Sequence, residues 1–295
     1  MDPPQNAGSR HAARSQTSGI PTLDALIGPS GLPYGLTFLI GSPIAGKTPL
    51  AMQFFLNVSD VAGSAIYCQY NLSATSLSEL AARTFERYGQ VRATPAQWGS
   101  ERRKPYRFYF GDEHAPGLKQ IQFSLPGMRR ELEEQGGAPF RLIVFDTLAQ
   151  GHPILLNDQG QLDTTRVAQI DAWAKKEKLS LVGTVDVQRT PAEGARPITH
   201  EWLDRHMKEP IMASSGAYVL HLDRRQLLEF KKKEPVRLQY MPASFNPPDP
   251  HGIDLILDHE RAWLFDADSE RNQVMRRALG MPARSANRPD WDEMS

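Results

Sequence analysis

The feature that most constrains this chain is the segment 41–48, GSPIAGKT, which matches the pattern G-x-x-x-x-G-K-[ST]. In loops of this kind, backbone N–H groups wrap around phosphate, and the helix that follows adds the positive end of its dipole. An apolar run at 36–40 precedes the segment and a helical apolar run at 50–56 follows it. This order of strand, loop and helix is the context that the motif requires, so the sequence predicts a phosphate-binding turn.

Every residue of the loop, together with Pro49, is expected to contact the bound nucleotide. The predicted contacts are Gly41, Ser42, Pro43, Ile44, Ala45, Gly46, Lys47, Thr48 and Pro49. Lys47 is expected to reach the β- and γ-phosphates, and the hydroxyl of Thr48 is expected to hold Mg²⁺. Pro49 falls in the first helical turn, where a missing N–H removes only an unpaired donor. Ile44 is β-branched and is therefore expected to avoid a positive φ.

A second acidic anchor for Mg²⁺ is predicted at Asp146. The apolar run Leu142–Phe145 reads as a buried strand, and Asp146 follows it directly. A carboxylate at the end of such a strand is the usual partner of the loop hydroxyl at a nucleotide site. We therefore expect Thr48 and Asp146 to share the metal, the alternative being that Asp146 only caps the end of the strand.

Composition sets the wider limits. The chain has 295 residues, enough for a large core, and a formal net charge of +0, which gives no global attraction for nucleic acid or membrane. Its single cysteine, Cys68, excludes an intrachain disulfide and favours a reducing compartment. No apolar run approaches the roughly 20 residues that span a bilayer, and the first residues are polar. These features predict a cytoplasmic protein without a membrane partner.

The pattern along the chain predicts three parts: a flexible tail at 1–18, a domain at 19–245 and a partly disordered C-terminal extension at 246–295. Expected strands are 36–40, 65–70, 107–110, 142–145, 179–185, 217–222, 227–230 and 236–240, with a hairpin at 253–265. Expected helices are 50–56, 76–88, 118–135 with an interruption near Pro126, 165–178 and 269–279. Strands alternating with helices indicate an α/β fold whose sheet is mainly parallel at its centre, with antiparallel strands toward the C-terminus.

The order of these motifs resembles the RecA-like P-loop ATPase superfamily, in the branch of KaiC/RadA and the DnaB-type helicases. The stretch 19–57, GIPTLDALIGPSGLPYGLTFLIGSPIAGKTPLAMQFFLN, is similar to the opening of that branch. The likeness continues through AIYCQYNLSATSLSELAAR, RLIVFDTLAQ, SLVGTVDVQRT and SGAYVLHLDR to about residue 241. It implies a RecA-like three-layer sandwich that binds ATP with Mg²⁺. It also implies a homo-oligomer, either a hexamer or a filament, with sites at subunit interfaces.

The resemblance also assigns roles beyond the loop. Lys47 and Asp146 match its catalytic positions, and Gln188 resembles the polar sensor that responds to the γ-phosphate. Lys231 and Lys233 stand where relatives carry a K-x-R pair that reaches the ATP of the neighbouring subunit. A cation there would stabilise charge in the transition state, although lysine lacks the bidentate fork of arginine. The alternatives are an exposed loop glutamine and a solvated lysine turn.

Asn71 is the sharpest departure from the family pattern. Relatives usually carry there a glutamate that activates the attacking water, whereas this chain reads YCQYNLS at 67–73. An amide can position water but cannot accept its proton. We therefore expect ATP hydrolysis to be slow or lost, which leaves open whether the chain is an enzyme. Asp112 and Glu113 follow another strand and are candidate substitutes.

Single-stranded DNA is a partner implied by the resemblance, but the local charges do not favour it. The stretch 186–215 holds four cations, Arg189, Arg196, Arg205 and Lys208, against five acids, Asp186, Glu193, Glu201, Asp204 and Glu209. Phosphate tracking needs a basic stripe, which this stretch lacks. Trp202 is a candidate for base stacking or a buried anchor. His200 and His206 are candidates for a metal site or, more simply, surface histidines.

Several functions therefore stay open. The first is a DNA-associated ATPase of the helicase or recombination-accessory type. The second is a KaiC-like signalling or scaffolding switch that acts through protein partners, and the third is a degenerate relative that holds a structural nucleotide. A small-molecule kinase fits the order of motifs less well. The segment 246–295 is a candidate docking arm for a protein partner or a neighbouring subunit.

Overall fold

The computed structural model describes residues 18–27, 31–61, 64–70, 106–109, 116–134, 139–148, 155–158, 161–187, 198–222, 233–245, 252–259, 262–267, 272–274 and 277. The expected helix at 76–88 and strand at 227–230 lie outside these residues, as does most of the expected helix at 269–279. None of the helices within the described part of the chain is long and apolar enough to cross a membrane.

One nine-stranded sheet organises the molecule, in the order β3-β2-β4-β5-β1-β6-β7-β8-β9. The parallel strands are β3 (Tyr106–Tyr109), β2 (Ser64–Gln69), β4 (Phe140–Asp146), β5 (Ser180–Asp186), β1 (Gly35–Gly41) and β6 (Gly216–Leu222). The antiparallel strands are β7 (Lys233–Met241), β8 (Ile253–Asp258) and β9 (Trp263–Asp266). The expected sheet, parallel at its centre and antiparallel toward the C-terminus, is therefore confirmed.

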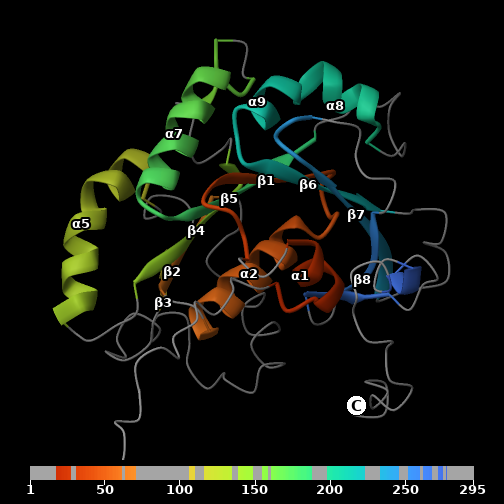
Figure 1. The fold of residues 1–295 in the computed structure, drawn as a ribbon, viewed down its shortest axis with the longest axis horizontal. Coiled ribbons are helices and arrows are strands. Elements are labelled where there is room, and N and C mark those ends of the chain that lie inside the picture. Colours follow the sequence, from red (N-terminus) through yellow and green to blue (C-terminus); the bar gives the residue numbers. More distant parts are fainter. Residues whose placement is uncertain are drawn as a thin grey trace, which may run out of the picture.

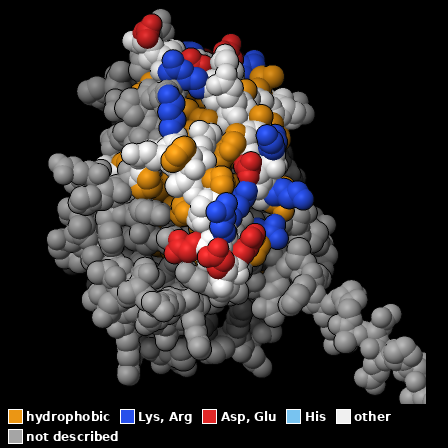
Figure 2. Space-filling view, turned by 90° about the vertical axis from the view of Figure 1, so that its left-hand side faces the viewer, with side chains coloured by type: hydrophobic (Ala, Val, Ile, Leu, Met, Phe, Trp, Pro, Cys, Tyr) orange, Lys and Arg blue, Asp and Glu red, His pale blue; other side chains and the backbone are white. Residues whose placement is uncertain are grey.

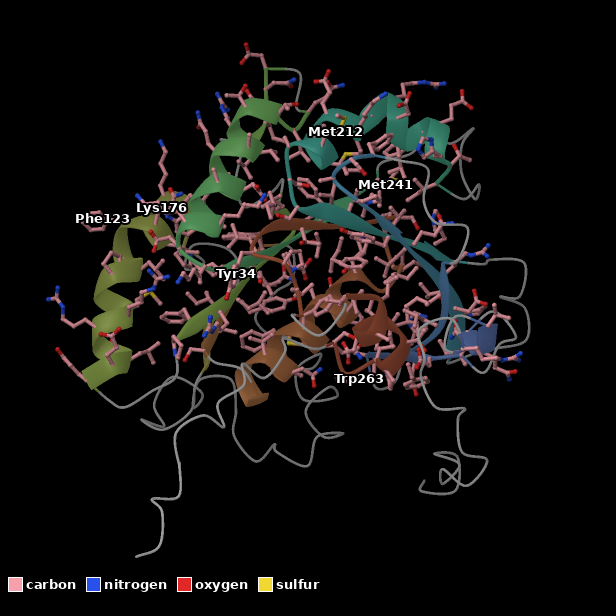
Figure 3. All side chains as sticks on the ribbon, in the orientation of Figure 1. Tyr34, Phe123, Lys176, Met212, Met241 and Trp263 are labelled. Atoms are coloured by element: carbon pink, nitrogen blue, oxygen red, sulfur yellow. The ribbon has the colours of Figure 1, made fainter. Side chains whose placement is uncertain are left out.

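Helices cover both faces of the sheet and produce three layers (Figure 1). One face carries α1 (Pro21–Ile27) and α2 (Lys47–Val61). The other carries α5 (Leu118–Glu134), α7 (Thr164–Lys176), α8 (His200–His206) and α9 (Lys208–Met212). Each face has its own buried apolar cluster. Trp263 belongs to the cluster under α1 and α2, and Met241 belongs to the cluster under the helices of the other face (Figure 3).

The expected interruption of the helix near Pro126 is wrong, because α5 runs unbroken from Leu118 to Glu134. Leu118, Ile121, Leu125, Met128 and Leu132 form one buried stripe that holds the helix against the sheet. Pro126 lies on the exposed side of α5. There the carbonyl oxygen that a proline leaves unpaired can be hydrated, which lowers the cost of the missing backbone hydrogen bond.

The sheet continues past the boundary expected at 245/246. The expected hairpin is present, since β8 pairs with both β7 and β9. Ile253, Leu255, Leu257 and Leu264 are at most 2% exposed and belong to the cluster that also contains residues of α1 and α2. The described part of 246–295 is therefore built into the sheet and its core, because an alternating strand buries one face against the neighbouring layer.

Gln53 of α2 fastens this hairpin to the helix that follows the loop. Its side-chain amide nitrogen donates to the carbonyl oxygen of Leu264 at 2.8 Å, and its amide oxygen accepts from the N–H of Leu264 at 2.9 Å. Gln53 is 0% exposed. Its primary amide has the donor and acceptor of a peptide group, so it pairs with the outer edge of β9 much as another strand would.

Replacing Gln53 by leucine, which has similar volume, is expected to destabilise the fold by roughly 2–4 kcal/mol, because both main-chain groups of Leu264 lose their partners while buried. The measurement is the free energy of unfolding from a urea titration. Gln169→Leu is the control, since Gln169 is an exposed glutamine of α7. A Gln53→Leu protein as stable as the control would contradict this role.

Candidate nucleotide-binding site

The loop 41–48 joins the end of β1 to the start of α2, as the sequence predicts. Its centre is a turn in which the N–H of Ala45 donates to the carbonyl oxygen of Ser42 at 3.1 Å. Pro43 takes the second position of this turn, and Ile44 takes the third with a φ of 63°. Proline followed by a positive φ is the arrangement of a type II turn, which normally places glycine third.

The expectation that Ile44 avoids a positive φ is therefore wrong. The turn imposes the left-handed conformation on Ile44 although its β-branch disfavours it, at a cost of about 1 kcal/mol or more. Little burial offsets this cost, because Ile44 is 64% exposed. The rest of the loop fixes its shape: Ala45, Gly46 and Lys47 are buried, so the chain on the α2 side of the turn is anchored in the core.

Two glycines allow the loop to approach the sheet closely. A Cβ on Gly41 would lie 3.1 Å from the Cβ of Ala45 and 3.1 Å from the carbonyl oxygen of Leu220, which leaves no room for a side chain. Gly46 has a φ of 88°, a conformation that L-residues rarely adopt. The space beneath Gly46 is closed by Leu257 of β8 and Leu264 of β9, so the C-terminal hairpin forms the floor of the loop.

The ammonium group of Lys47 lies inside the loop and is only 6% exposed. Its Nζ donates to the carbonyl oxygens of Gly41 at 3.0 Å and Ser42 at 2.7 Å. It also forms an ion pair with Asp186, at 2.7 Å from Nζ to Oδ1. Asp186 ends β5 and is the register partner of Gly41 in β1, so two neighbouring strand ends hold this cation.

Thr48 and Asp146 are brought together, although they are almost a hundred residues apart in sequence. The Thr48 side chain forms a hydrogen bond with the Asp146 carboxylate. Pro49 lies in the first turn of α2, and the helical bond from the N–H of Leu50 to the carbonyl oxygen of Gly46 is made at 3.0 Å. A hydroxyl and a carboxylate in contact at a helix N-terminus offer the oxygen ligands that Mg²⁺ prefers.

Asp146 is fully buried, and three further side chains donate to it. Tyr67 Oη and Gln69 Nε2 donate to Oδ2 at 2.8 and 3.0 Å, and Thr184 Oγ1 donates to Oδ1 at 2.5 Å. Burial raises the pKa of Asp146, while the hydrogen bonds from Thr184, Thr48 and Tyr67 and the charge of Lys47 oppose that rise. Burial also raises the pKa of Tyr67 well above its usual range, so Tyr67 is a proton donor to the carboxylate.

Sequence reasoning missed Tyr67, Gln69, Thr184 and the contact of Asp186 with Lys47. The only signal was position, since Gln69 and Asp186 end predicted strands and the carboxyl ends of parallel strands meet at one edge of the sheet.

The remaining predicted residues are not brought to the site by any described contact. Gln188, Lys231, Asn71, Asp112 and Glu113 lie outside the described residues. Lys233 begins β7, where its backbone is in register with Asp258 of β8. The roles expected for these residues stay predictions.

The two histidines considered for a metal make separate aromatic contacts. The ring of His200 lies 5.0 Å from that of Phe245, and the ring of His206 lies 4.7 Å from that of Trp202. Trp202 is partly buried against the core. Among the residues that the structure covers, no group of three His, Cys, Asp or Glu side chains is placed to hold a metal ion.

Comparison with known proteins supports the fold. No protein-family model matches the sequence, and no curated protein matches it. Many solved structures are similar, among them the ATPase domain of a DnaB-like helicase, with a TM-score of 0.59 and 14% identity over 87% of this chain and 94% of that one. With the loop between β1 and α2, this similarity defines the architecture as a RecA-like α/β fold of the P-loop ATPase type.

The raised pKa of Asp146 predicts a pH-dependent stability. Between about pH 4 and the raised value, the folded protein retains a proton that the unfolded chain has released, so the free energy of unfolding falls as pH rises. Asp146→Asn removes this contribution. We expect the wild type to lose stability relative to Asp146→Asn between about pH 5 and pH 7.

The measurement is the free energy of unfolding of both proteins at each pH. Asp204→Asn is the control, because the pKa of Asp204 is lowered by its hydrogen bond with Lys208. Asp204 is therefore charged in both states across this interval, and its replacement should leave the slope unchanged. Equal slopes for wild type and Asp146→Asn would contradict the prediction.

Proposed function

We propose that the chain binds ATP with Mg²⁺ at the loop 41–48. The observation that carries the proposal is the contact of Thr48 with the buried carboxylate of Asp146 beside the N-terminus of α2. The positive end of a 15-residue helix and the enclosed ammonium group of Lys47 face the same loop. Phosphate, an ammonium group and a divalent cation with oxygen ligands are thus all provided for within one short stretch of structure.

The residues present fit a magnesium ion. Thr48 and Asp146 would hold it, and Asp146 remains anchored by Tyr67, Gln69 and Thr184, which orient its oxygens. When bound, the ion would neutralise phosphate charge and polarise the β–γ linkage. Lys47 binds the phosphate chain from the loop side, and the backbone around Gly46 excludes water from beneath it, because Leu257 and Leu264 close that side.

Hydrolysis is proposed to be slow or absent. This proposal rests on Asn71, which stands where related proteins carry the base, and losing a general base typically lowers a rate by a factor of about 10²–10⁴. The trans contribution of Lys231 and Lys233, and the response of Gln188 to the γ-phosphate, belong to the same proposal and require a homo-oligomer, either a hexamer or a filament.

Two settings for this ATP site are proposed. The first is association with single-stranded DNA in helicase or recombination-accessory work, which the family resemblance supports. The second is a KaiC-like switch acting through protein partners. Figure 2 favours the second for the face over α5 and α7, where Lys and Arg side chains are interspersed with Asp, Glu and apolar side chains. Such mixed charge suits protein contacts better than phosphate tracking. The salt dependence of single-strand binding separates the two settings.

The ATP-binding proposal predicts that the purified protein binds Mg²⁺-ATP in an equilibrium titration. Lys47→Ala should weaken binding about ten- to a hundredfold, because a charge-assisted contact to phosphate is lost. Thr48→Val should reduce the gain in affinity that Mg²⁺ gives. Lys208→Ala is the matched control, since Lys208 forms an ion pair of 2.7 Å with Asp204 on the surface. Affinity that neither loop variant changes would refute the proposed site.

The base hypothesis predicts that Asn71→Glu raises the rate of ATP hydrolysis at saturating Mg²⁺-ATP by about 10²-fold or more, because a carboxylate can accept the proton of the attacking water. The measurement is phosphate release, with Asn71→Gln as the control that has the length of glutamate and no charge. Wild-type turnover of several ATP molecules per second would show that Asn71 does not cripple the site.

A further inference from the structure

The ammonium group of Lys47 has no unused hydrogen-bond donor. A lysine carries three N–H donors. Three acceptors lie within 3.0 Å of Nζ: the carbonyl oxygens of Gly41 and Ser42 and the carboxylate oxygen of Asp186. A phosphate oxygen that binds Lys47 must therefore displace one of these three acceptors.

Asp186 is the acceptor that can leave. The carbonyl of Gly41 is part of β1 and is held in place, because it also accepts from the N–H of Val187 at 3.0 Å. The carbonyl of Ser42 is fixed by the turn that it closes with Ala45. Asp186 contacts Lys47 only through its side chain and is 32% exposed, so rotation of that side chain moves its carboxylate into solvent, where it is well hydrated.

The position and the charge of this carboxylate match those of a ligand oxygen. It is an anionic oxygen at 2.7 Å from the group that is expected to bind the β- and γ-phosphates. If it stayed in place beside a bound phosphate chain, the two anions would repel each other strongly, because Lys47 is 6% exposed and little water screens the site. Binding of phosphate and the ion pair of Asp186 with Lys47 are therefore mutually exclusive.

We propose that Asp186 acts as an internal anion that occupies the phosphate position on Lys47, and so sets both the affinity and the charge selectivity of the loop. This inference rests on the proposed function. A single phosphate group brings little more charge than the carboxylate it must replace, whereas a magnesium-bound triphosphate adds contacts with Thr48 and the α2 N-terminus. Asp186 thus excludes orthophosphate from the loop and admits the polyphosphate chain.

The test compares wild type, Asp186→Asn and Asp186→Ala by titration with Mg²⁺-ATP and with orthophosphate. Asparagine keeps the shape of the side chain and removes its charge. We expect Asp186→Asn to bind Mg²⁺-ATP about tenfold more tightly than wild type, equivalent to about 1.4 kcal/mol. We also expect orthophosphate to compete with ATP in the variant at concentrations that leave the wild type unaffected. Asp186→Ala should behave in the same way, which separates the loss of charge from any contact made by the new amide.

Asp204→Asn is the matched control, because it removes the same charge from an ion pair of equal length, 2.7 Å, on the surface of α8. It should bind both ligands as the wild type does. Wild-type binding with no gain in Asp186→Asn would overturn the role of Asp186 and leave the ATP site standing. Binding by Asp186→Asn alone would support both. Failure of every protein to bind would overturn the proposed function and this inference together.

Discussion

The carboxylate of Asp146 is the group on which the rest of the site depends. It is fully buried at the end of β4, and it accepts hydrogen bonds from β2 through Tyr67 and Gln69 and from β5 through Thr184. Burying an ionised carboxylate is costly, so each donor is needed to offset the lost hydration. The same bonds fix the ends of three neighbouring strands relative to one another. The group that would hold a metal is therefore also the group that aligns this edge of the sheet.

The phosphate loop depends on parts of the chain that are remote in sequence. Its cation is held by Asp186 at the end of β5, and its underside rests on Leu257 and Leu264 of the C-terminal hairpin. The strained conformation of Ile44 persists because both ends of the loop are anchored in the core. Local sequence defines what the loop is able to bind, while distant segments hold it in the shape that binding requires.

This division explains which features the sequence predicted. The loop and Asp146 were found because the residues that matter are contiguous, or directly follow a recognisable apolar strand. Tyr67, Gln69 and Thr184 were missed because their contacts with Asp146 depend on β2, β4 and β5 being neighbours, and strand order is not written in any short segment. At Pro126 and Ile44 a correct local preference was overridden, in one case by the buried stripe of α5 and in the other by the turn around Pro43.

The pairing of Gln53 with Leu264 joins residues 211 positions apart. A ribosome releases the helix that contains Gln53 long before it has made the strand that satisfies this amide. During most of translation, the phosphate loop therefore exists without its floor, and the apolar side chains that will later meet Leu257 and Leu264 remain accessible to chaperones or to other nascent chains. The final shape of the earliest functional motif is thus decided by one of the last strands of the sheet to be made.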